Sequence, residues 1–276
     1  MKLIFAKNIG FCSGVKRTVM IAEEATKNSK RPVQFLGSLV HNEKVIEKFK
    51  KKRVRFIKYL KEAEPGTLII QAHGIPPFSK KIMDELVIKD ATCPLVKRVQ
   101  LIARDLQDKG FKVVIIGDKK HPESKGIKGY AKNKAIIVEN VKQAENLPKF
   151  KKIGVVIQTT QNLKKVNKIL KILKKKTKEI VFKDTICPEV KIRQEELSLI
   201  LKKADAVLVI GSKNSANTKE LVNIAKEAKK PVWLANSPEE LNKDVFNVPI
   251  LGITSGTSAP NWEINKIKKW LEEKQR

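Results

Sequence analysis

The chain has 276 residues, of which 41% are hydrophobic, enough for a sizeable packed core. It carries 58 Lys and Arg against 29 Asp and Glu, a net charge of +29, and its three cysteines are too few and too dispersed for a disulfide-rich secreted domain. No apolar run approaches the roughly 18 residues of a membrane span, and the first residues lack signal-peptide features. We therefore expect a globular cytoplasmic protein with no membrane partner.

Short apolar runs alternate with helical patterns along the chain. Each run is bounded by Gly, Pro or charged residues, as buried strands are. The predicted strands are residues 2–6, 31–36, 66–71, 111–117, 134–139, 152–158, 205–211, 230–235 and 248–254. The predicted helices are residues 13–28, 42–50, 94–108, 161–176, 188–203, 216–229 and 260–273. This alternation predicts an α/β protein with mostly parallel sheets covered by helices on both faces.

The excess of lysine by itself suggests binding to nucleic acid. In residues 162–179, however, the apolar side chains form a helical stripe and the lysines occupy the opposite, solvated face. Aromatic residues make up only 5% of the chain, and it has neither a base-stacking box nor zinc-finger spacing. We expect no specific nucleic-acid partner, whereas an acidic protein would be attracted to this charge.

All three cysteines lie in copies of one phrase. DATCPLVKRVQ (residues 90–100) returns as DTICPEVKIRQ (residues 184–194), and FCSGVKR (residues 11–17) has the same Cys-x-x-Val-Lys order. Each copy lies where a strand pattern changes to a helical one, and the helix start would favour a thiolate. The repeat predicts three α/β units around a common centre, residues 1–93, 94–187 and 188–276, the last with a C-terminal helix.

A shared ligand explains three cysteines in one phrase better than three independent buried hydrophobes do. Structural zinc usually takes four Cys or His ligands, often from close C-x₂₋₄-C pairs, which are absent here. Three thiolates from separate elements suit an iron–sulfur cluster with one iron not ligated by protein, which is a Lewis acid and an electron carrier. A zinc or thiol enzyme is the alternative.

Candidate anion-binding residues follow several strand patterns. His41, His73 and His121 lie at such breaks, where ligands of open α/β sheets bind. The turns GSKNSAN (residues 211–217) and TSGTSAP (residues 254–260) each open a helix, where N–H and hydroxyl groups can hold phosphate. Solvated histidines and ordinary helix caps are the alternatives, and a cap is also one interpretation of QTTQ (residues 158–161).

Nine segments follow one another along the chain: NIGFCSGV, LVHNE, AHG, DATCPLV, HPE, QTTQ, DTIC, GSKNSAN and TSGTSAP. In this order they resemble the motifs of the IspH/LytB family, the 4-hydroxy-3-methylbut-2-enyl diphosphate reductases. The resemblance extends from Gly10 to Pro260. It implies a trefoil of three pseudo-repeated α/β units around one 4Fe-4S cluster. It also implies two-electron reductive dehydroxylation of the substrate to isopentenyl and dimethylallyl diphosphates, the last step of the methylerythritol phosphate route to isoprenoids.

The resemblance implies roles for individual residues as well. Three irons would be ligated by Cys12, Cys93 and Cys187. The substrate diphosphate would be bound by His41, His73, His121, Ser215, Asn217 and Ser258. Glu123, an ordinary surface glutamate if read alone, would deliver protons, and Thr159 would position the substrate hydroxyl. Ala216 stands where many members have a serine, which predicts a loss of about 1 kcal/mol in diphosphate binding. An acidic ferredoxin or flavodoxin is the expected electron donor.

Overall fold

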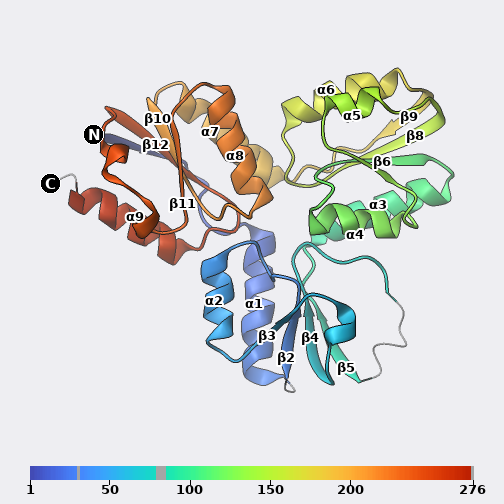
Figure 1. The fold of residues 1–276 in the computed structure, drawn as a ribbon, viewed down its shortest axis with the longest axis horizontal. Helices are drawn as coiled ribbons and strands as arrows, with labels where there is room; N and C mark the ends of the chain where they lie inside the picture. The colour runs from blue at the N-terminus through green and yellow to red at the C-terminus, as the bar shows by residue number, and fades with distance from the viewer. Residues whose placement is uncertain (30–31, 79–84, 275–276) are drawn as a thin grey trace. The chain divides into compact units, whose positions relative to one another are not determined.

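The described residues, 1–29, 32–78 and 85–274 of a computed structural model, form three separate four-stranded sheets (Figure 1). Every strand pair in them is parallel. The predicted fold class, a trefoil of three α/β units with parallel sheets, is confirmed in this respect. The chain separates into two compact units: unit 1 is Met1–Lys16, Val40–Lys51 and Pro188–Arg276, and unit 2 is Arg17–Leu39 and Lys52–Cys187.

Sheet A belongs to unit 1. Its spatial order is β1 (Lys2–Phe5), β12 (Ile250–Ser255), β10 (Ala206–Ile210) and β11 (Val232–Ala235). Helix α9 (Asn261–Lys274) buries Ile264, Ile267 and Leu271 against one face. Helices α7 (Pro188–Leu201) and α8 (Ala216–Glu227) cover the other face with Leu197 and Leu221 (Figure 1). The unit also contains α2 (Glu43–Lys50), η3 (Pro238–Glu240) and η4 (Lys243–Phe246).

Sheets B and C belong to unit 2. Sheet B has the order β3 (Arg55–Ile57), β2 (Val33–Leu36), β4 (Gly66–Ile70) and β5 (Leu86–Asp90). Helix α1 (Ser13–Asn28) is tied to it by the hydroxyl of Thr18, which donates to the carbonyl of Ala91 at 2.9 Å, and η1 (Leu60–Glu62) follows β3.

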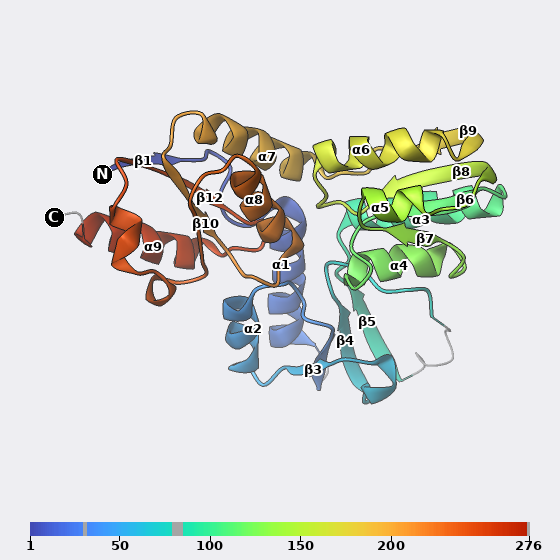
Figure 2. The ribbon, with the colours of Figure 1, turned by 45° about the horizontal axis from the view of Figure 1, so that its top comes forward.

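Sheet C has the order β7 (Ile136–Val138), β6 (Lys112–Ile116), β8 (Phe150–Ile157) and β9 (Thr177–Phe182). Helices α3 (Pro94–Asp108) and α4 (Pro122–Tyr130) pack on one face through Val99, Leu106 and Ile127. Helices α5 (Val141–Glu145) and α6 (Leu163–Lys174) lie on the other face (Figure 2).

The three sheets share one strand order. In sheets B and C the chain lays down a central strand, an outer strand, a second central strand and a final edge strand. Sheet A follows the same plan with β10, β11 and β12, but its final edge strand is β1, from the other end of the chain. The domain ranges 1–93, 94–187 and 188–276 stay a prediction, and the sheets depart from them because the N-terminal strand completes the last repeat.

Most predicted elements are present, and those that the sequence analysis missed have weak patterns. The missed strands are β3, β5 and β9, which are three to six residues long and interrupted by charged residues. Helix α4 was missed because it contains Gly126 and Gly129, which are poor helix formers. Gly129 lies so close to Pro76 that a Cβ there would be 2.5 Å from a proline carbon. Arg31, the first residue of one predicted strand, lies outside the described residues.

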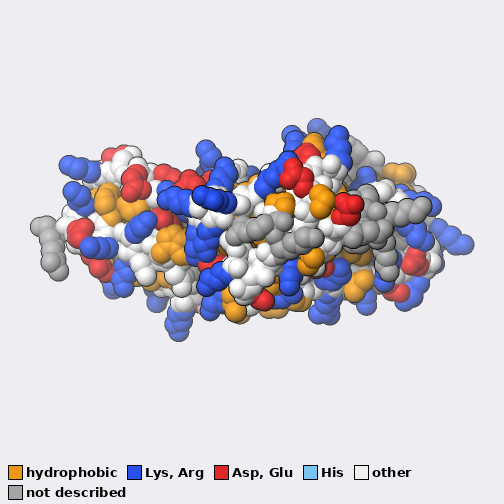
Figure 3. Space-filling model, turned by 90° about the horizontal axis from the view of Figure 1, so that it is seen from below, with side chains coloured by type: hydrophobic (Ala, Val, Ile, Leu, Met, Phe, Trp, Pro, Cys, Tyr) orange, Lys and Arg blue, Asp and Glu red, His pale blue; other side chains and the backbone are white. Residues whose placement is uncertain are grey.

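The basic residues occupy solvated surfaces. Figure 3 shows Lys and Arg side chains spread over the face in view, with Asp and Glu side chains between them. Helix α6 follows the predicted amphipathic pattern, because Val166, Ile169, Leu170 and Leu173 are buried while most of its lysines are exposed. None of the helices that the described residues form has the length and apolar character of a membrane span.

Candidate functional site

The three cysteines occupy the same place in their respective sheets. Each follows an edge strand, and its backbone N–H donates to a carbonyl in the loop after the neighbouring strand. The acceptors are the carbonyls of Thr257 for Cys12 at 3.1 Å, Ala72 for Cys93 at 2.9 Å and Thr159 for Cys187 at 2.9 Å. All three cysteines lie in the described residues, all are half-buried, and none forms a disulfide. The repeated phrase therefore encodes one local geometry three times.

Two of the sulfur atoms contact the first turn of the helix that follows. The N–H of Val15 donates to Sγ of Cys12 at 3.4 Å, and Sγ of Cys93 accepts from the N–H groups of Leu95 and Val96. For Cys93, however, burial raises the pKa of the thiol, and this effect exceeds the lowering by those N–H groups and by Arg17. The N–H groups at the helix start favour the thiolate of Cys93 as predicted, but burial outweighs them and the net pKa is raised. A bound metal would have to displace that proton.

The loop that carries Cys12 is held rigidly within unit 1. The N–H of Gly10 donates to the hydroxyl of Ser255 at 2.8 Å. Arg193, buried on α7, donates to the carbonyl of Gly10 at 2.7 Å and to that of Ser255 at 3.0 Å. Gly10 has φ +86, and a Cβ there would lie 2.0 Å from the side-chain oxygen of Asn261. This tight turn requires glycine, and it fixes the backbone just before the cysteine.

Unit 1 also contains four of the predicted substrate-binding residues. Ser215 and Asn217 lie at the start of α8, after β10, and Ser258 follows β12, the adjacent strand. The hydroxyl of Ser258 donates to the carbonyl of His41 at 3.1 Å. Both loops therefore lie at the carboxyl edge of sheet A, the usual position of a ligand in such a sheet.

Asn217 is the clearest candidate for an anion-binding side chain in unit 1. Its side chain is 1% exposed, and neither its Nδ2 nor its Oδ1 has a hydrogen-bond partner. Buried polar groups are nearly always paired, because an unpaired one loses its hydration without compensation. The group lies in the first turn of a 12-residue helix, where the helix dipole favours an anion. A phosphate oxygen at this position could accept from Nδ2, and the helix dipole would favour its negative charge.

His41 is held in its neutral form. Burial lowers the pKa of its imidazole, and the nearby ammonium of Lys219 lowers it further, against an opposing effect of Glu43. A neutral imidazole retains one N–H, so it can donate to a phosphate oxygen, while Lys219 supplies a full positive charge nearby.

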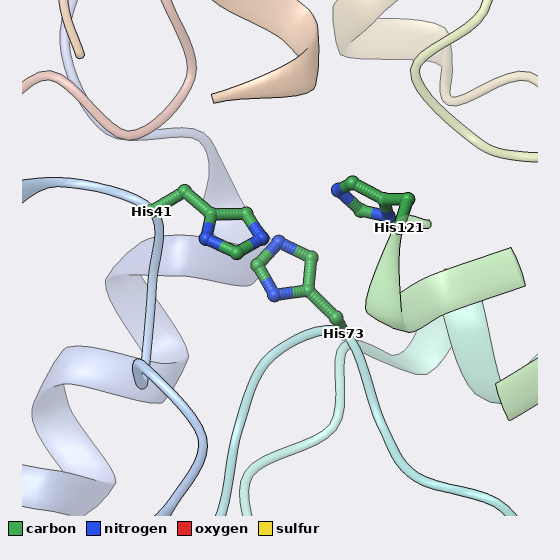
Figure 4. A group of neighbouring side chains, drawn as sticks. All are labelled: His41, His73 and His121. Atoms are coloured by element: carbon green, nitrogen blue, oxygen red, sulfur yellow. The ribbon is translucent and has the colours of Figure 1, made fainter. Parts of the chain in front are cut away.

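In unit 2, His73 and His121 follow β4 and β6 and lie next to each other. Their rings meet edge to face, with centroids 5.0 Å apart (Figure 4). His121 caps α4, because its Nδ1 accepts the backbone N–H of Glu123 at 3.2 Å. In the neutral ring the proton is therefore on Nε2, which leaves an N–H donor on the far side of the imidazole.

Glu123 and Thr159 form a buried pair in unit 2. Both the N–H and the hydroxyl of Thr159 donate to the Glu123 carboxylate, at 2.6 and 2.9 Å. Glu123 is 1% exposed, so the alternative of a surface glutamate is wrong. Burial raises the pKa of its carboxyl to about 7, although the Thr159 hydrogen bonds oppose this, and Asp118 raises it further. The carboxyl is poised to hold and release a proton near neutral pH.

The acid lies close to two of the cysteines. Its charge acts on the Cys93 thiol, raising the pKa of that group. Its partner Thr159 accepts, through the backbone carbonyl, the N–H of Cys187 at 2.9 Å. Unit 2 thus brings Cys93, Cys187, Glu123 and Thr159 together.

The predicted site residues occupy two equivalent positions in the repeat. The neighbours of the edge strands that precede the cysteines are β12, β4 and β8. The loops after these strands carry Ser258 in sheet A, His73 in sheet B and Thr159 in sheet C. The segment after the next strand, a loop or the first turn of the following helix, carries Asn217 in sheet A, His41 in sheet B and the pair His121 and Glu123 in sheet C. Arg193 was not among the predicted site residues, although it lies inside a repeated cysteine phrase. Gln158 was noted only within QTTQ, as part of a possible helix cap and of the family motif.

Comparison with protein-family models identifies the family of the chain. The model for the LytB protein family matches residues 3–272. The chain belongs to the LytB protein family. This confirms the resemblance read from the motifs, since the match includes every predicted site residue.

Known members of the family are similar to the chain over nearly its whole length. The 4-hydroxy-3-methylbut-2-enyl diphosphate reductase of Dictyoglomus turgidum is 42% identical over 277 residues, which cover 99% of this chain and 96% of the relative. The enzyme of the same name from Geobacter metallireducens is 36% identical over 276 residues, covering 99% and 98%.

Two solved structures agree in fold. The E-1-hydroxy-2-methyl-but-2-enyl-4-diphosphate reductase from Plasmodium falciparum aligns with a TM-score of 0.91 and 32% identity, covering 99% of this chain and 87% of the other. A structure of (E)-4-hydroxy-3-methyl-but-2-enyl diphosphate reductase, described as the terminal enzyme of the non-mevalonate pathway, aligns with a TM-score of 0.71 and 36% identity, covering 99% and 100%.

Proposed function

We propose that the chain is a 4-hydroxy-3-methylbut-2-enyl diphosphate reductase. It converts this allylic diphosphate to isopentenyl and dimethylallyl diphosphates by two-electron reductive dehydroxylation. The observation that carries the proposal is the buried Glu123–Thr159 pair, a proton donor beside Cys93 in a chain whose full-length relatives bear this name.

The experiment that tests the function is product analysis under strict exclusion of oxygen. The anaerobically purified chain, given a low-potential reductant and 4-hydroxy-3-methylbut-2-enyl diphosphate, should release both isoprenoid diphosphates. If an iron-loaded preparation leaves the substrate unchanged, the proposal is wrong.

The cysteines fit an iron–sulfur cluster as the cofactor. Cys12, Cys93 and Cys187 are half-buried thiols in three equivalent loops, and none is used in a disulfide. We assign them as the three protein ligands of one 4Fe-4S cluster, whose fourth iron has no protein ligand. Such a cluster supplies electrons one at a time and a Lewis-acidic metal for an alcohol oxygen. The protein itself binds the diphosphate and supplies the proton.

The diphosphate is bound by hydrogen-bond donors rather than by carboxylates, since the ligand is itself an anion. In unit 1 the donors are the amide of Asn217, the hydroxyl of Ser215 and the imidazole of His41, joined by the hydroxyl of Ser258 when it turns away from the carbonyl of His41. In unit 2 they are the imidazoles of His73 and His121, the latter through its Nε2–H.

Glu123 supplies the proton that converts the substrate hydroxyl into water. Near its pKa of about 7 a large fraction of the carboxyl carries a proton, which can pass to a hydroxyl held by Oγ1 of Thr159. Because Thr159 binds both carboxylate oxygens through its N–H and hydroxyl, it orients the acid before the substrate arrives.

Replacing Asn217 by aspartate should weaken substrate binding. The change removes the buried Nδ2 donor and places a carboxylate against the diphosphate. We expect KM to rise by roughly 10- to 100-fold, the effect of losing a hydrogen bond to a charged group, with a smaller change in kcat. Asn223→Asp, on the exposed side of the same helix, is the matched control. An unchanged KM in the Asn217 variant would remove this residue from the site.

The electron donor is proposed to be an acidic ferredoxin or flavodoxin, because the chain carries a net charge of +29. Donor-dependent turnover should then fall by roughly tenfold between about 0.05 and 0.3 M salt, as surface charges become screened. The control is turnover driven by a small chemical reductant, which reports any effect of salt on substrate binding. Equal salt dependence with both reductants would contradict the charge-guided encounter.

A further inference from the structure

Gln158 is a fully buried polar residue at the end of β8. Its backbone N–H donates to the carbonyl of Ile116 at 2.9 Å, which continues the β6–β8 ladder by one residue. The residue is thus fixed to the centre of sheet C. It directly precedes Thr159, the partner of the buried acid.

The side chain of Gln158 makes three hydrogen bonds. Its Oε1 accepts the backbone N–H of Asp118 at 2.8 Å and the hydroxyl of Ser124 at 3.0 Å. Its Nε2 donates to the hydroxyl of Thr160 at 2.9 Å. Residues 118 and 124 are the two ends of the segment that carries His121 and Glu123. One amide oxygen therefore holds both ends of the acid's segment, and the amide nitrogen holds the loop of its partner.

Gly117 makes room for this arrangement. A Cβ at Gly117 would lie 2.8 Å from the Cβ of Gln158, from its Oε1 and from the hydroxyl of Ser124. Atoms at that separation would clash, so a side chain at residue 117 would push the amide out of place. The glycine, the amide and the serine are packed as one group.

We infer that Gln158 is a positioning residue for Glu123, and that it sets the distance between this acid and the substrate hydroxyl. The inference rests on the proposed function of Glu123 as the proton donor. A donor must be held close to its hydrogen-bonded geometry, and a misplacement of about 1 Å can cost up to about 100-fold in rate. Gln158 meets this need because it joins α4 to the rigid end of β8.

The test replaces Gln158 by methionine, which has a similar length and no hydrogen-bonding amide. We expect kcat to fall by about 10- to 100-fold and KM to rise by a smaller factor, because only one of the proposed diphosphate donors, His121, lies on the segment that Gln158 holds. Gln158→Glu should restore most of the rate, since a carboxylate can accept from Asp118, Ser124 and Thr160. Gln143→Met is the matched control: Gln143, on α5, accepts the N–H of Glu139 at 2.8 Å beside the edge strand β7, and its loss should leave kcat unchanged.

Hydrogen exchange supplies a readout that does not depend on turnover. In Gln158→Met the amide of Thr159, which donates to Glu123, should exchange faster than in the parent and in Gln143→Met. Ser124→Ala, which removes one bond of the three, should give a smaller change in the same direction and serves if the methionine variant does not fold. Unchanged kcat and unchanged Thr159 exchange in the folded variants would overturn the inference.

Failure of the inference is distinguishable from failure of the proposed function. An active parent whose Gln158→Met variant is as fast as Gln143→Met refutes the positioning role and leaves the reductase intact. A parent that forms no product refutes the reductase, and the positioning role, which depends on it, falls as well, even if the exchange data show that Gln158 orders Thr159.

Discussion

Replacement of Glu123 by glutamine is expected to lower kcat by roughly 100- to 10,000-fold, the range attributed to a positioned general acid. The amide matches the carboxyl in size and can still bind Thr159, so the fold and the bound iron should be retained. What is lost is the dissociable proton. The measurement is kcat with a chemical reductant, together with iron content and visible absorption to establish that the cofactor is intact.

The pH dependence of the parent follows from the same residue. Burial places the pKa of Glu123 at about 7, and in the proposed mechanism the protonated form is the donor. Turnover should therefore be close to its maximum below pH 7 and should fall about tenfold for each pH unit well above it. The residual activity of Glu123→Gln should lack this decline.

Glu139→Gln provides the matched control for both measurements. Glu139 lies at the end of β7 in the same sheet and accepts the N–H of Lys119 at 2.9 Å, but hydrogen bonds from Lys119 and Gln143 lower its pKa. It is therefore ionised throughout the range in which turnover is measured, and its replacement should leave kcat and the pH profile unchanged. Full activity of Glu123→Gln, or a parent profile that is flat through pH 7, would dismiss Glu123 as the acid.

Replacing any one of Cys12, Cys93 and Cys187 by alanine is expected to abolish turnover and to remove most of the bound iron. In the proposed site each thiol supplies one of only three protein ligands, and the equivalent loops offer no substitute. Anaerobically purified parent should contain about four iron atoms per chain, and each variant well below half of that. The loss should be similar for the three variants, because the three cysteines have the same local geometry.

Thr92→Ser, next to Cys93, is the control for general disturbance of a cysteine loop. It keeps the hydroxyl and leaves the backbone carbonyl that accepts from Arg17, so iron content should match the parent. If one cysteine variant retains full iron and full visible absorption, that cysteine is not a ligand and the three-cysteine site is wrong.

The repeated cysteine phrase predicted the three α/β units because it encodes a local event, the change from an edge strand to a helix. The phrase could not predict which strand completes each sheet. β1 pairs with β12 although they lie at opposite ends of the chain, and such pairing is decided by long-range packing that leaves no local pattern. The chain position of Cys12 therefore suggested a first unit, whereas its strand belongs to the last sheet.

The candidate residues could be found from motifs, but their physical states could not. The HPE motif shows that Glu123 is two residues from His121. Its burial and raised pKa come from the packing of α4 against sheet C, which the motif does not show. For Cys93 the helix start was visible in the sequence, while the burial that outweighs it depends on the tertiary fold. The sequence showed Gln158 only as the first residue of QTTQ. Two of its partners, Asp118 and Ser124, are more than 30 residues away in the chain and are brought to it by the sheet.

The most direct test of the central claim, that three cysteines hold one iron–sulfur cluster, is metal and sulfide analysis of the chain purified without oxygen. We predict a brown protein with about four irons and about four acid-labile sulfides per chain, and no stoichiometric zinc. A colourless protein with one zinc, or one without metal, would contradict the account.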